Sequence, residues 1–256
     1  MIIPAGASRV EYFRRSLEQG LPFEPTNGQS EAIYALSRFL DSKKEKCCFL
    51  LKGYAGTGKT SLMKSMVEFL ESESVPYKCL APTGRAAKVL SSYTGRRAFT
   101  IHKHIYKRVL DTNTGKSIFM MNPNRRKGMV FIVDEASMIA DGSSLLGNDL
   151  LEDLLEHVYA APGCRLLLIG DEAQLPPVHL DRSPAMDADL LAERYDLVIA
   201  ERHLTEVVRQ ATDSGILEYA TEIRKRIEEE TPSVQSIPIP AADDISYLSP
   251  IDLPDL

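Results

Sequence analysis

The residues from Gly53 to Thr60 have the types and the spacing of a phosphate-binding loop, G-x-x-x-x-G-K-T. Glycines in such a loop let the backbone bend so that its N–H groups face a phosphate. We expect Lys59 to reach the β- and γ-phosphates of a nucleotide and the Thr60 hydroxyl to bind Mg²⁺. The alternative is a glycine-rich turn that binds nothing. The expected nucleotide-binding residues of the loop are Gly53, Ala55, Gly56, Thr57, Gly58, Lys59 and Thr60.

Two carboxylates and one carboxamide follow later apolar runs of the chain. Asp134 and Glu135 come directly after the run 129–133. Acids at the carboxyl end of a parallel strand project into the ligand crevice, so we expect Asp134 to hold Mg²⁺ and Glu135 to polarise an attacking water. Gln174 lies just past the run 165–171, at the same end of the predicted sheet, where it could sense a γ-phosphate.

The elements that must position these residues alternate between strands and helices. After the phosphate loop, apolar residues recur at the spacing of one helix face, at Leu62, Met63, Met66, Phe69 and Leu70. Short apolar runs predict buried strands at 47–51, 77–81, 129–133, 165–171 and 197–199. This alternation predicts an α/β fold of the P-loop NTPase class, with a parallel sheet flanked by helices.

The composition is that of an ordinary soluble protein, with 44% hydrophobic and 26% charged residues among 256. No apolar run approaches the roughly 18 residues of a membrane span, and the amino terminus lacks the apolar core of a signal peptide. The four cysteines show no C-x-x-C spacing, so we expect buried free thiols in a reducing, cytoplasmic setting.

The charge of the chain is distributed unevenly. The segment 85–128 carries eleven Lys/Arg and one acid, a net charge of +10, whereas the whole chain carries −6. Such asymmetry is a candidate footprint for a polyanion, although a basic run can also be only a solvated face. The candidate nucleic-acid contacts in this segment are Arg85, Arg125, Arg126 and Lys127.

Two turns that open helices lie near this basic segment. Pro82 and Thr83 begin one of them, whose hydroxyl and amide groups could hold a phosphate beside Arg85. Thr100 begins the second, which contains His102 and His104. We reject a metal site here because residues i and i+2 point apart on a helix and no acid or cysteine stands nearby. Between 106 and 128, a turn at 111–115 predicts a small, basic β-hairpin.

Taken together and in order, seven stretches resemble the first RecA-like motor domain of the RecD-like helicases of superfamily 1, the branch that moves five-prime to three-prime on single-stranded DNA. The resemblance extends from about residue 23 to 230. The stretches are PTNGQ (25–29), GYAGTGKT (53–60), APTGRAAKVL (81–90), TIHKHIY (100–106), VDEASM (133–138), GDEAQLPPV (170–178) and LTEVVRQ (204–210).

The resemblance implies a role for each matched position. Gln29 reads adenine, the loop cradles the phosphates and Mg²⁺, and Asp134 and Glu135 serve the metal and the water. Gln174 contacts the γ-phosphate and couples it to DNA, and Arg209 acts as an arginine finger. The stretches that correspond to contacts with the single-stranded backbone contain Pro82, Thr83, Thr100, His102 and His104. The hairpin insertion at 107–128 corresponds to the pin that splits the duplex in relatives.

The expected organisation has three parts. They are an amino-terminal extension (1–24), a RecA-like motor domain (25–230) and a Pro/Asp-rich linker or tail (231–256). These helicases need a second RecA-like domain, whose further motifs we do not find in this sequence. The resemblance therefore implies that this chain alone is only weakly active and that the second domain is a partner.

Two other functions fit parts of the sequence. A P-loop small-molecule kinase would need a lid and an acceptor pocket, and it would leave the basic segment and the stretch 170–178 unexplained. A nucleotide-gated DNA-binding module without efficient turnover would bind ATP and hydrolyse little of it. ATP consumption with and without single-stranded DNA distinguishes the kinase from the motor.

Overall fold

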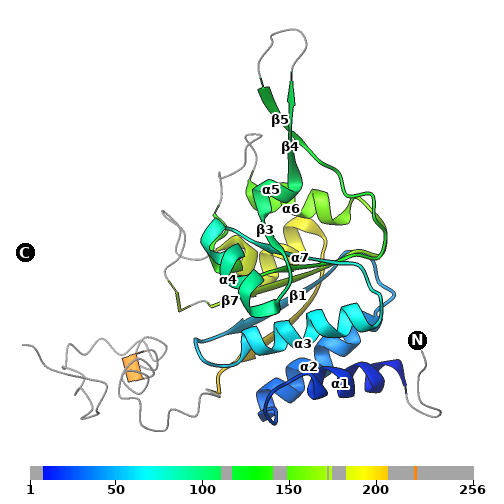
Figure 1. Ribbon diagram of the computed structural model, residues 1–256, viewed down its shortest axis with the longest axis vertical. Helices are drawn as coiled ribbons and strands as arrows, with labels where there is room; N and C mark the ends of the chain where they lie inside the picture. Colours follow the sequence, from blue (N-terminus) through cyan, green and yellow to red (C-terminus); the bar gives the residue numbers. More distant parts are fainter. Residues whose placement is uncertain are drawn as a thin grey trace, which may run out of the picture. The chain divides into compact units, whose positions relative to one another are not determined.

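The computed structural model describes residues 8–110, 117–140, 149–171, 173–174, 183–206 and 222–223. Its centre is a sheet of six parallel strands in the order β3-β2-β6-β7-β1-β8 (Figure 1). The predicted parallel sheet flanked by helices is confirmed. The strands are β1 (Cys47–Gly53), β2 (Tyr77–Ala81), β3 (Ala98–Thr100), β6 (Val130–Val133), β7 (Arg165–Gly170) and β8 (Val198–Leu204).

Helices cover both faces of the sheet, which explains why β1 and β7 are almost continuously apolar. On β1, Phe49 and Leu51 pack toward one face, whereas Cys48 and Leu50 pack toward the other. The first face is covered by α1 (Arg9–Gln19), α2 (Asn27–Asp41), α3 (Lys59–Ser72) and α4 (Gly84–Thr94). The second is covered by α5 (Ile101–Ile105), α6 (Leu150–Tyr159), α7 (Ala188–Tyr195) and the short 3₁₀ turns η1 (Ala136–Met138) and η2 (Pro184–Met186).

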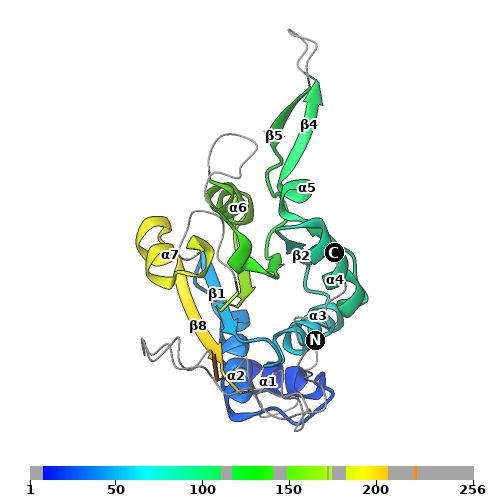
Figure 2. The same ribbon diagram turned by 90° about the vertical axis from the view of Figure 1, so that its left-hand side faces the viewer.

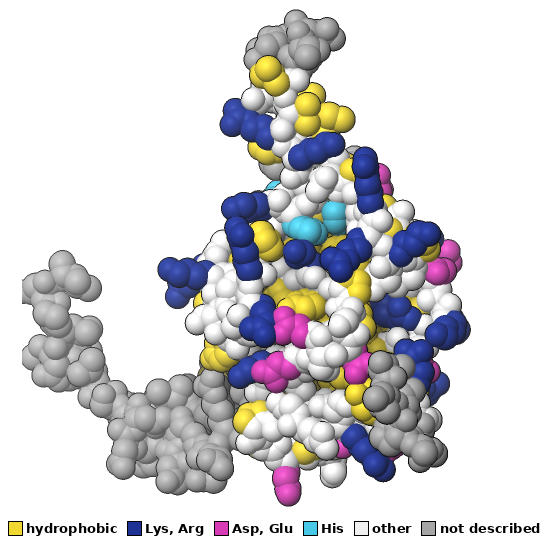
Figure 3. Space-filling model, turned by 45° about the vertical axis from the view of Figure 1, so that its right-hand side comes forward, with side chains coloured by type: hydrophobic (Ala, Val, Ile, Leu, Met, Phe, Trp, Pro, Cys, Tyr) yellow, Lys and Arg dark blue, Asp and Glu magenta, His cyan; other side chains and the backbone are white. Residues whose placement is uncertain are grey.

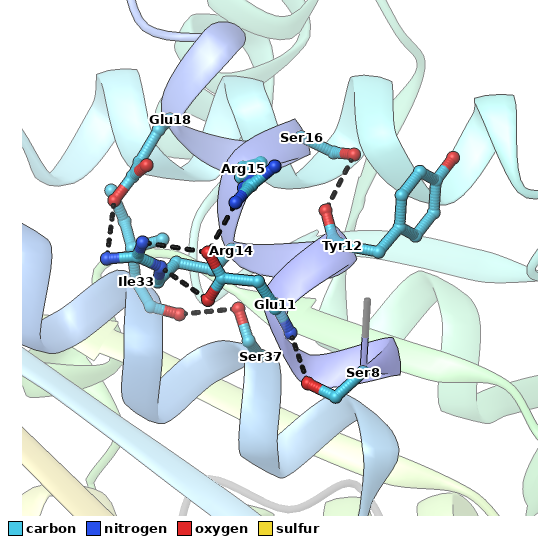
Figure 4. Close-up of polar contacts among 9 residues, drawn as sticks. All are labelled: Ser8, Glu11, Tyr12, Arg14, Arg15, Ser16, Glu18, Ile33 and Ser37. Carbon is cyan, nitrogen blue, oxygen red and sulfur yellow. Dashed lines mark hydrogen bonds and ion pairs between the residues drawn. The ribbon is translucent and has the colours of Figure 1, made fainter. Parts of the chain in front are cut away.

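Helix α1, which lies within the predicted extension 1–24, packs into the same core as α2 and α3. Ser8 caps the helix by accepting a hydrogen bond from the Glu11 amide (3.1 Å), and Arg14 forms ion pairs with Glu11 and Glu18 along its exposed side (Figure 4). Its other side buries Phe13 and Leu17. We conclude that α1 helps to close the sheet face that supports the phosphate loop.

A two-stranded antiparallel ribbon, β4 (Tyr106–Leu110) and β5 (Ser117–Met121), follows α5 and stands out from the sheet (Figures 1 and 2). Its predicted turn at 111–115 lies outside the described residues. The expectation of a ribbon that is basic throughout is wrong for β5, which contains no Lys or Arg and exposes three apolar side chains. These are Ile118, Phe119 and Met120, at 43%, 47% and 45%.

Helix α6 holds both strands of the ribbon at their base. The Tyr106 hydroxyl, at the start of β4, donates to the buried carboxylate of Asp153 (2.5 Å). One turn further along α6, Nδ1 of His157 lies 2.6 Å from the carbonyl oxygen of Asn122, just after β5. Because Asp153 and His157 are four residues apart, they share one buried face of the helix.

The boundaries of two elements differ from those predicted. Helix α6 begins at Leu150 instead of about 145, although residues 141–148 lie outside the described part of the chain. Strand β8 continues to Leu204 instead of ending at 199, since Glu201, Arg202 and His203 interrupt the apolar pattern without interrupting the pairing with β1. No helix in the described residues is long and apolar enough to cross a membrane.

Candidate nucleotide site and nucleic-acid interface

The loop between β1 and α3 has the backbone that its glycines predict. Gly56 and Gly58 have φ angles of 85° and 87°, which L-residues with a side chain rarely adopt. A Cβ atom at Gly58 would lie 2.4 Å from Nε2 of Gln29, so space as well as conformation requires glycine there. The loop leads directly into the amino terminus of α3, whose unpaired amide groups and dipole favour an anion.

Lys59 lies over the loop that precedes it. Its Nζ donates to the carbonyl oxygens of Gly53 (2.5 Å) and Tyr54 (2.9 Å) and lies 3.9 Å from Oδ2 of Asp171. Asp171 is almost fully buried, and its Oδ1 accepts a hydrogen bond from the Ala173 amide (3.0 Å). The ammonium group is therefore held where a phosphate bound by the loop would meet it.

Two residues that we expected to touch the nucleotide are engaged with the protein instead. Gln29 is 1% exposed: its Oε1 accepts from the Thr26 amide (3.1 Å) and its Nε2 donates to the Thr57 carbonyl (2.9 Å). Thr57 is fully buried, and its hydroxyl donates to the Tyr54 carbonyl (2.8 Å). In this arrangement both residues brace the loop, and their contacts with a nucleotide stay predictions.

Asp134 and Glu135 follow β6, so they lie at the carboxyl ends of the parallel strands, as does the loop after β1. We call this side of the sheet its carboxyl edge, and the side where the strands begin its amino edge. Burial, and then the neighbouring Glu135, raise the pKa of Asp134 to about 6. Glu135 has a φ of 55°, a left-handed conformation that is uncommon outside glycine and clusters at functional sites. Next to it, the Ser183 hydroxyl donates to the carbonyl oxygens of Ala136 and Ile139, which fixes the turn η1.

The remaining predicted residues are distributed as follows. Ala55 is exposed, whereas Thr60 is partly buried at the start of α3. Gln174 is exposed, and its amide donates to the Asp171 carbonyl (3.2 Å), so it lies beside the partner of Lys59. Arg209 lies outside the described residues. Sequence reasoning assigned no role to Asp171, although it has the signal that identified Asp134, an acid directly after a buried strand.

A family model described as an AAA domain matches residues 26–234 of the chain. The chain belongs to this family. Over 172 residues it is 34% identical to the ATP-dependent RecD2 DNA helicase of Deinococcus radiodurans, covering 67% of the chain and 21% of that protein. Over 202 residues it is 33% identical to the ATP-dependent DNA helicase dda of Enterobacteria phage T4, covering 78% of the chain and 42% of that protein.

The AAA-family chain is thus a motor domain of the RecD/Pif1-like group of superfamily 1 helicases, as its motifs predicted. It spans less than half the length of the two curated relatives. The crystal structure of the Pif1 helicase from Candida albicans shares its fold, with a TM-score of 0.50 and 21% identity over 79% of the chain and 44% of that protein.

In this motor domain, the two turns expected to hold a nucleic-acid backbone lie side by side. Strands β2 and β3 pair in parallel, and Ala81 is opposite Thr100, so both strands deliver a helix at the same edge. Thr83 caps α4 by accepting from the Ala86 amide (3.2 Å), and Thr100 caps α5 by accepting from the Lys103 amide (3.2 Å). Pro82 precedes the first cap, and Arg85 is exposed on the first turn of α4.

The two histidines of α5 differ from each other. The His104 ring packs inward against Phe131 and His157, with centroid distances of 6.0 and 5.0 Å. Burial, and then His157, lower the pKa of His104 to about 4. His102 is partly exposed and packs against Tyr106 (5.7 Å). Of the pair, His102 is the better placed to meet a ligand. On the face shown in Figure 3, Lys and Arg side chains gather on and below the ribbon.

The structure does not bring the basic triplet Arg125–Lys127 to those helix caps. All three side chains are exposed, but the chain here has already reached the opposite edge of the sheet, just before β6 begins. The Arg126 carbonyl accepts from Sγ of Cys164 (3.3 Å), and the Gly128 amide donates to the Pro162 carbonyl (3.0 Å). The charge run identified in the sequence therefore divides into two separate surfaces.

Proposed function

We propose that this domain binds ATP with Mg²⁺ at the carboxyl edge of its sheet and that hydrolysis there drives movement along single-stranded DNA. The observation that carries the proposal is the convergence of Lys59, the Asp134–Glu135 pair and the caps of α4 and α5 at one edge. A turn that binds nothing would not need a buried Asp171 beside Lys59, nor acids at the end of a parallel strand.

The residues at this edge fit a magnesium ion. Mg²⁺ in nucleotide sites usually takes one or two carboxylates and the oxygens of the phosphates. Asp134 and the Thr60 hydroxyl would hold it. The raised pKa of Asp134 supports this, because burial and a neighbouring acid leave its negative charge poorly compensated by the protein. The described residues contain no cluster of three His, Cys, Asp or Glu, so the ion would depend on the nucleotide for most of its ligands.

Each protein group has a distinct task in the proposed reaction. Lys59 and the loop amides bind and orient the phosphates, and Glu135 polarises the water that attacks the γ-phosphate. Gln174, exposed beside Asp171, would contact the γ-phosphate and couple nucleotide binding to the DNA-binding surface. Arg209 would stabilise the charge that develops during transfer. These roles are the ones that the resemblance of the motifs to those of RecD-like helicases implies.

The proposed nucleic-acid path crosses the caps of α4 and α5 and continues onto the ribbon. The Thr83 and Thr100 hydroxyls and the first amides of their helices would donate hydrogen bonds to phosphate oxygens, and Arg85, Lys103 and Arg108 would supply positive charge. Both relatives named above are described as ATP-dependent DNA helicases, which supports DNA as the polymer. The four cysteines are buried and free, which supports a cytoplasmic location.

A second RecA-like domain would complete the nucleotide site from its open side. We therefore expect the 256-residue chain alone to bind ATP, to hydrolyse it slowly with little stimulation by DNA, and to unwind nothing. An arginine finger contributes about 10³–10⁵ in rate in P-loop enzymes, and a second domain would supply one further donor. Translocation in addition needs two domains that close and open on the strand.

The test combines steady-state ATP hydrolysis with strand displacement on a five-prime-tailed duplex, using the purified monomer. ATP binding with slow hydrolysis and no displacement is the expected result. Robust displacement by this chain alone would contradict the need for a second domain. Absence of ATP binding in the presence of Mg²⁺ would contradict the nucleotide site itself.

A further inference from the structure

Strand β8 is an edge strand, the last in the strand order of the six-stranded sheet. It pairs in parallel with β1 along its whole length, and in the described part of the chain no strand lies on its other side. An exposed strand edge presents unpaired backbone donors and acceptors, which makes it a template for another strand unless the protein covers it.

The pairing with β1 identifies the backbone groups that face outward. The Val198 amide donates to the Lys46 carbonyl (3.0 Å), and the Leu204 carbonyl accepts from the Tyr54 amide (3.4 Å). Both groups therefore point toward β1. Because the N–H and C=O of successive strand residues alternate in direction, every second residue between them points away. The outward-facing peptide groups are those of Ile199, Glu201 and His203.

A groove of about 300 Å³ lies beside this edge, between β8 and the second half of α2. Its floor is apolar and includes the buried side chains of Phe39 and Cys47. Two exposed apolar side chains border it, Tyr34 from α2 (47%) and Val198 from β8 (40%). A strand added to β8 would set alternate side chains over this floor.

Three cations surround the apolar floor: Arg38, Lys44 and Arg202. All three are exposed, and none forms an ion pair within the described residues. Nη1 of Arg202 donates to the Glu201 carbonyl (2.7 Å), one of the outward-facing groups. Arg202 thus covers part of the open edge, and displacement of this contact would free its guanidinium for a carboxylate.

We propose that the groove is a docking site for an extended, acidic and apolar segment of a partner protein, which adds to β8 as a further strand. Main-chain hydrogen bonds to the outward-facing groups would give affinity, and the floor and the three cations would select alternating apolar and acidic side chains. A nucleic-acid strand is also an anion, but its sugar-phosphate backbone lacks the amide donors that would satisfy the outward carbonyls of β8.

The groove is separate from the nucleotide site. It adjoins Val198 to Arg202, whereas the phosphate loop contacts the other end of β8 at Leu204. Binding of a peptide in the groove is therefore independent of ATP binding, and failure of either proposal leaves the other testable.

The first experiment measures fluorescence anisotropy of a short, labelled, N-acetylated peptide of alternating valine and aspartate. We expect saturable binding. The double variant Arg38→Glu/Arg202→Glu should weaken it by about tenfold or more, since two ion pairs are replaced by repulsion. The control Lys64→Glu/Arg194→Glu changes the net charge equally at exposed sites outside the groove and should bind like the wild type. No binding by the wild type, or equal binding by both variants, would overturn the proposal.

The second experiment reads the strand register by NMR-detected hydrogen exchange. Peptide binding should slow exchange of the Ile199, Glu201 and His203 amides, while the Val198 and Ala200 amides, already directed at β1, change little. Of two peptides N-methylated at the odd or at the even residues, only the one whose methylated nitrogens face away from β8 should bind. Protection without this alternation, competition by a single-stranded oligonucleotide, or self-association through β8 without peptide would each contradict the docking of an acidic strand.

Discussion

The two edges of the central sheet use their charged residues differently. At the carboxyl edge, Lys59 begins α3, and Asp134 and Glu135 follow directly after β6. At the amino edge, Arg165 donates to the carbonyl oxygens of Phe39, Ser42 and Gly163, and Glu45 accepts from the Gly163 amide (2.9 Å).

This difference shows why the count of charges along the sequence is a poor guide to function. The same strands deliver charged residues to both edges. At the amino edge these residues satisfy backbone groups that the folding of loops leaves unpaired, whereas the carboxyl edge presents helix amino termini that need an external partner. Substitutions at the two edges should therefore have opposite effects on activity and stability.

The largest expected effect belongs to Glu135→Gln. ATP binding should be kept, while hydrolysis should fall by about 10²–10⁴-fold, because the amide cannot polarise the attacking water as the carboxylate does. Steady-state hydrolysis and nucleotide titration measure the two quantities. The matched variant at the other edge, Glu45→Gln, should hydrolyse ATP like the wild type. Equal losses in both variants would remove the distinction between the edges.

Lys59→Ala should lower ATP affinity by roughly ten- to a hundredfold, because a hydrogen bond to a charged group is worth about 1.5–3 kcal/mol. The fold should be unaffected, since Lys59 donates to carbonyl oxygens of the phosphate loop and lies beside Asp171, outside the hydrophobic core. Isothermal titration calorimetry with Mg²⁺ and a slowly hydrolysed analogue gives the affinity. The site assignment would be wrong if the two proteins bound with equal affinity.

Arg165→Ala should show the reverse behaviour. Loss of its bonds to three backbone carbonyls should lower the free energy of unfolding by about 1–3 kcal/mol, with ATP affinity unchanged. Urea denaturation and calorimetry provide the two readouts. Arg38, exposed on α2, offers a control, since Arg38→Ala removes an arginine without removing such bonds. A fall in ATP affinity comparable to that of Lys59→Ala would contradict a purely structural role.

The basic segment 85–128 should contain one group of cations that contacts DNA, near the carboxyl edge, and one at the amino edge that does not. When a protein binds single-stranded DNA, the logarithm of its affinity falls with the logarithm of the salt concentration, with a slope of about −0.7 per phosphate contact. Replacing Lys103, Lys107 and Arg108 together with Ala should flatten this slope by as much as two, whereas the triplet Arg125, Arg126 and Lys127 should change it little. Fluorescence titrations at several salt concentrations measure both slopes. A larger change for the second triplet would reverse the proposed path.

The smallest expected effect concerns pH. His104 has a pKa of about 4 in the folded protein, below its ordinary value of 6.5, so the unfolded chain binds a proton more readily between these values. Its contribution to stability should therefore be present above pH 6.5 and lost as the pH falls toward 4. Thermal unfolding of the wild type and of His104→Phe at several pH values should show a weaker acid dependence for the variant. Equal acid dependence of the two proteins would contradict this contribution.

The sequence predicted what depends on short spacing. The phosphate loop, the acids after β6 and the alternation of strands and helices all follow from local patterns that the structure retains. Gln29 was identified by its motif, but its burial against Thr57 depends on how α2 packs on the loop, which no local pattern specifies.

Position relative to the edges of the sheet could not be predicted in the same way. Arg85 and Arg125 belong to one basic run, yet between them the chain passes through β3, α5 and the ribbon. It then runs beside the last turns of α6 to the other edge of the sheet. The apolar strand β5 was hidden inside the same run because charge was counted over the whole segment. Both cases show that a composition average conceals the direction in which each residue faces.

The most direct test of this account is hydrogen exchange, followed by mass spectrometry, with and without single-stranded DNA in the presence of an ATP analogue and Mg²⁺. The first amides of α4 and α5 lack partners within their helices and would be covered by the strand. We predict slower exchange at 82–87 and 100–104 and no change at 123–128. Protection confined to 123–128, with none at the two helix starts, would contradict the assignment of DNA to the carboxyl edge.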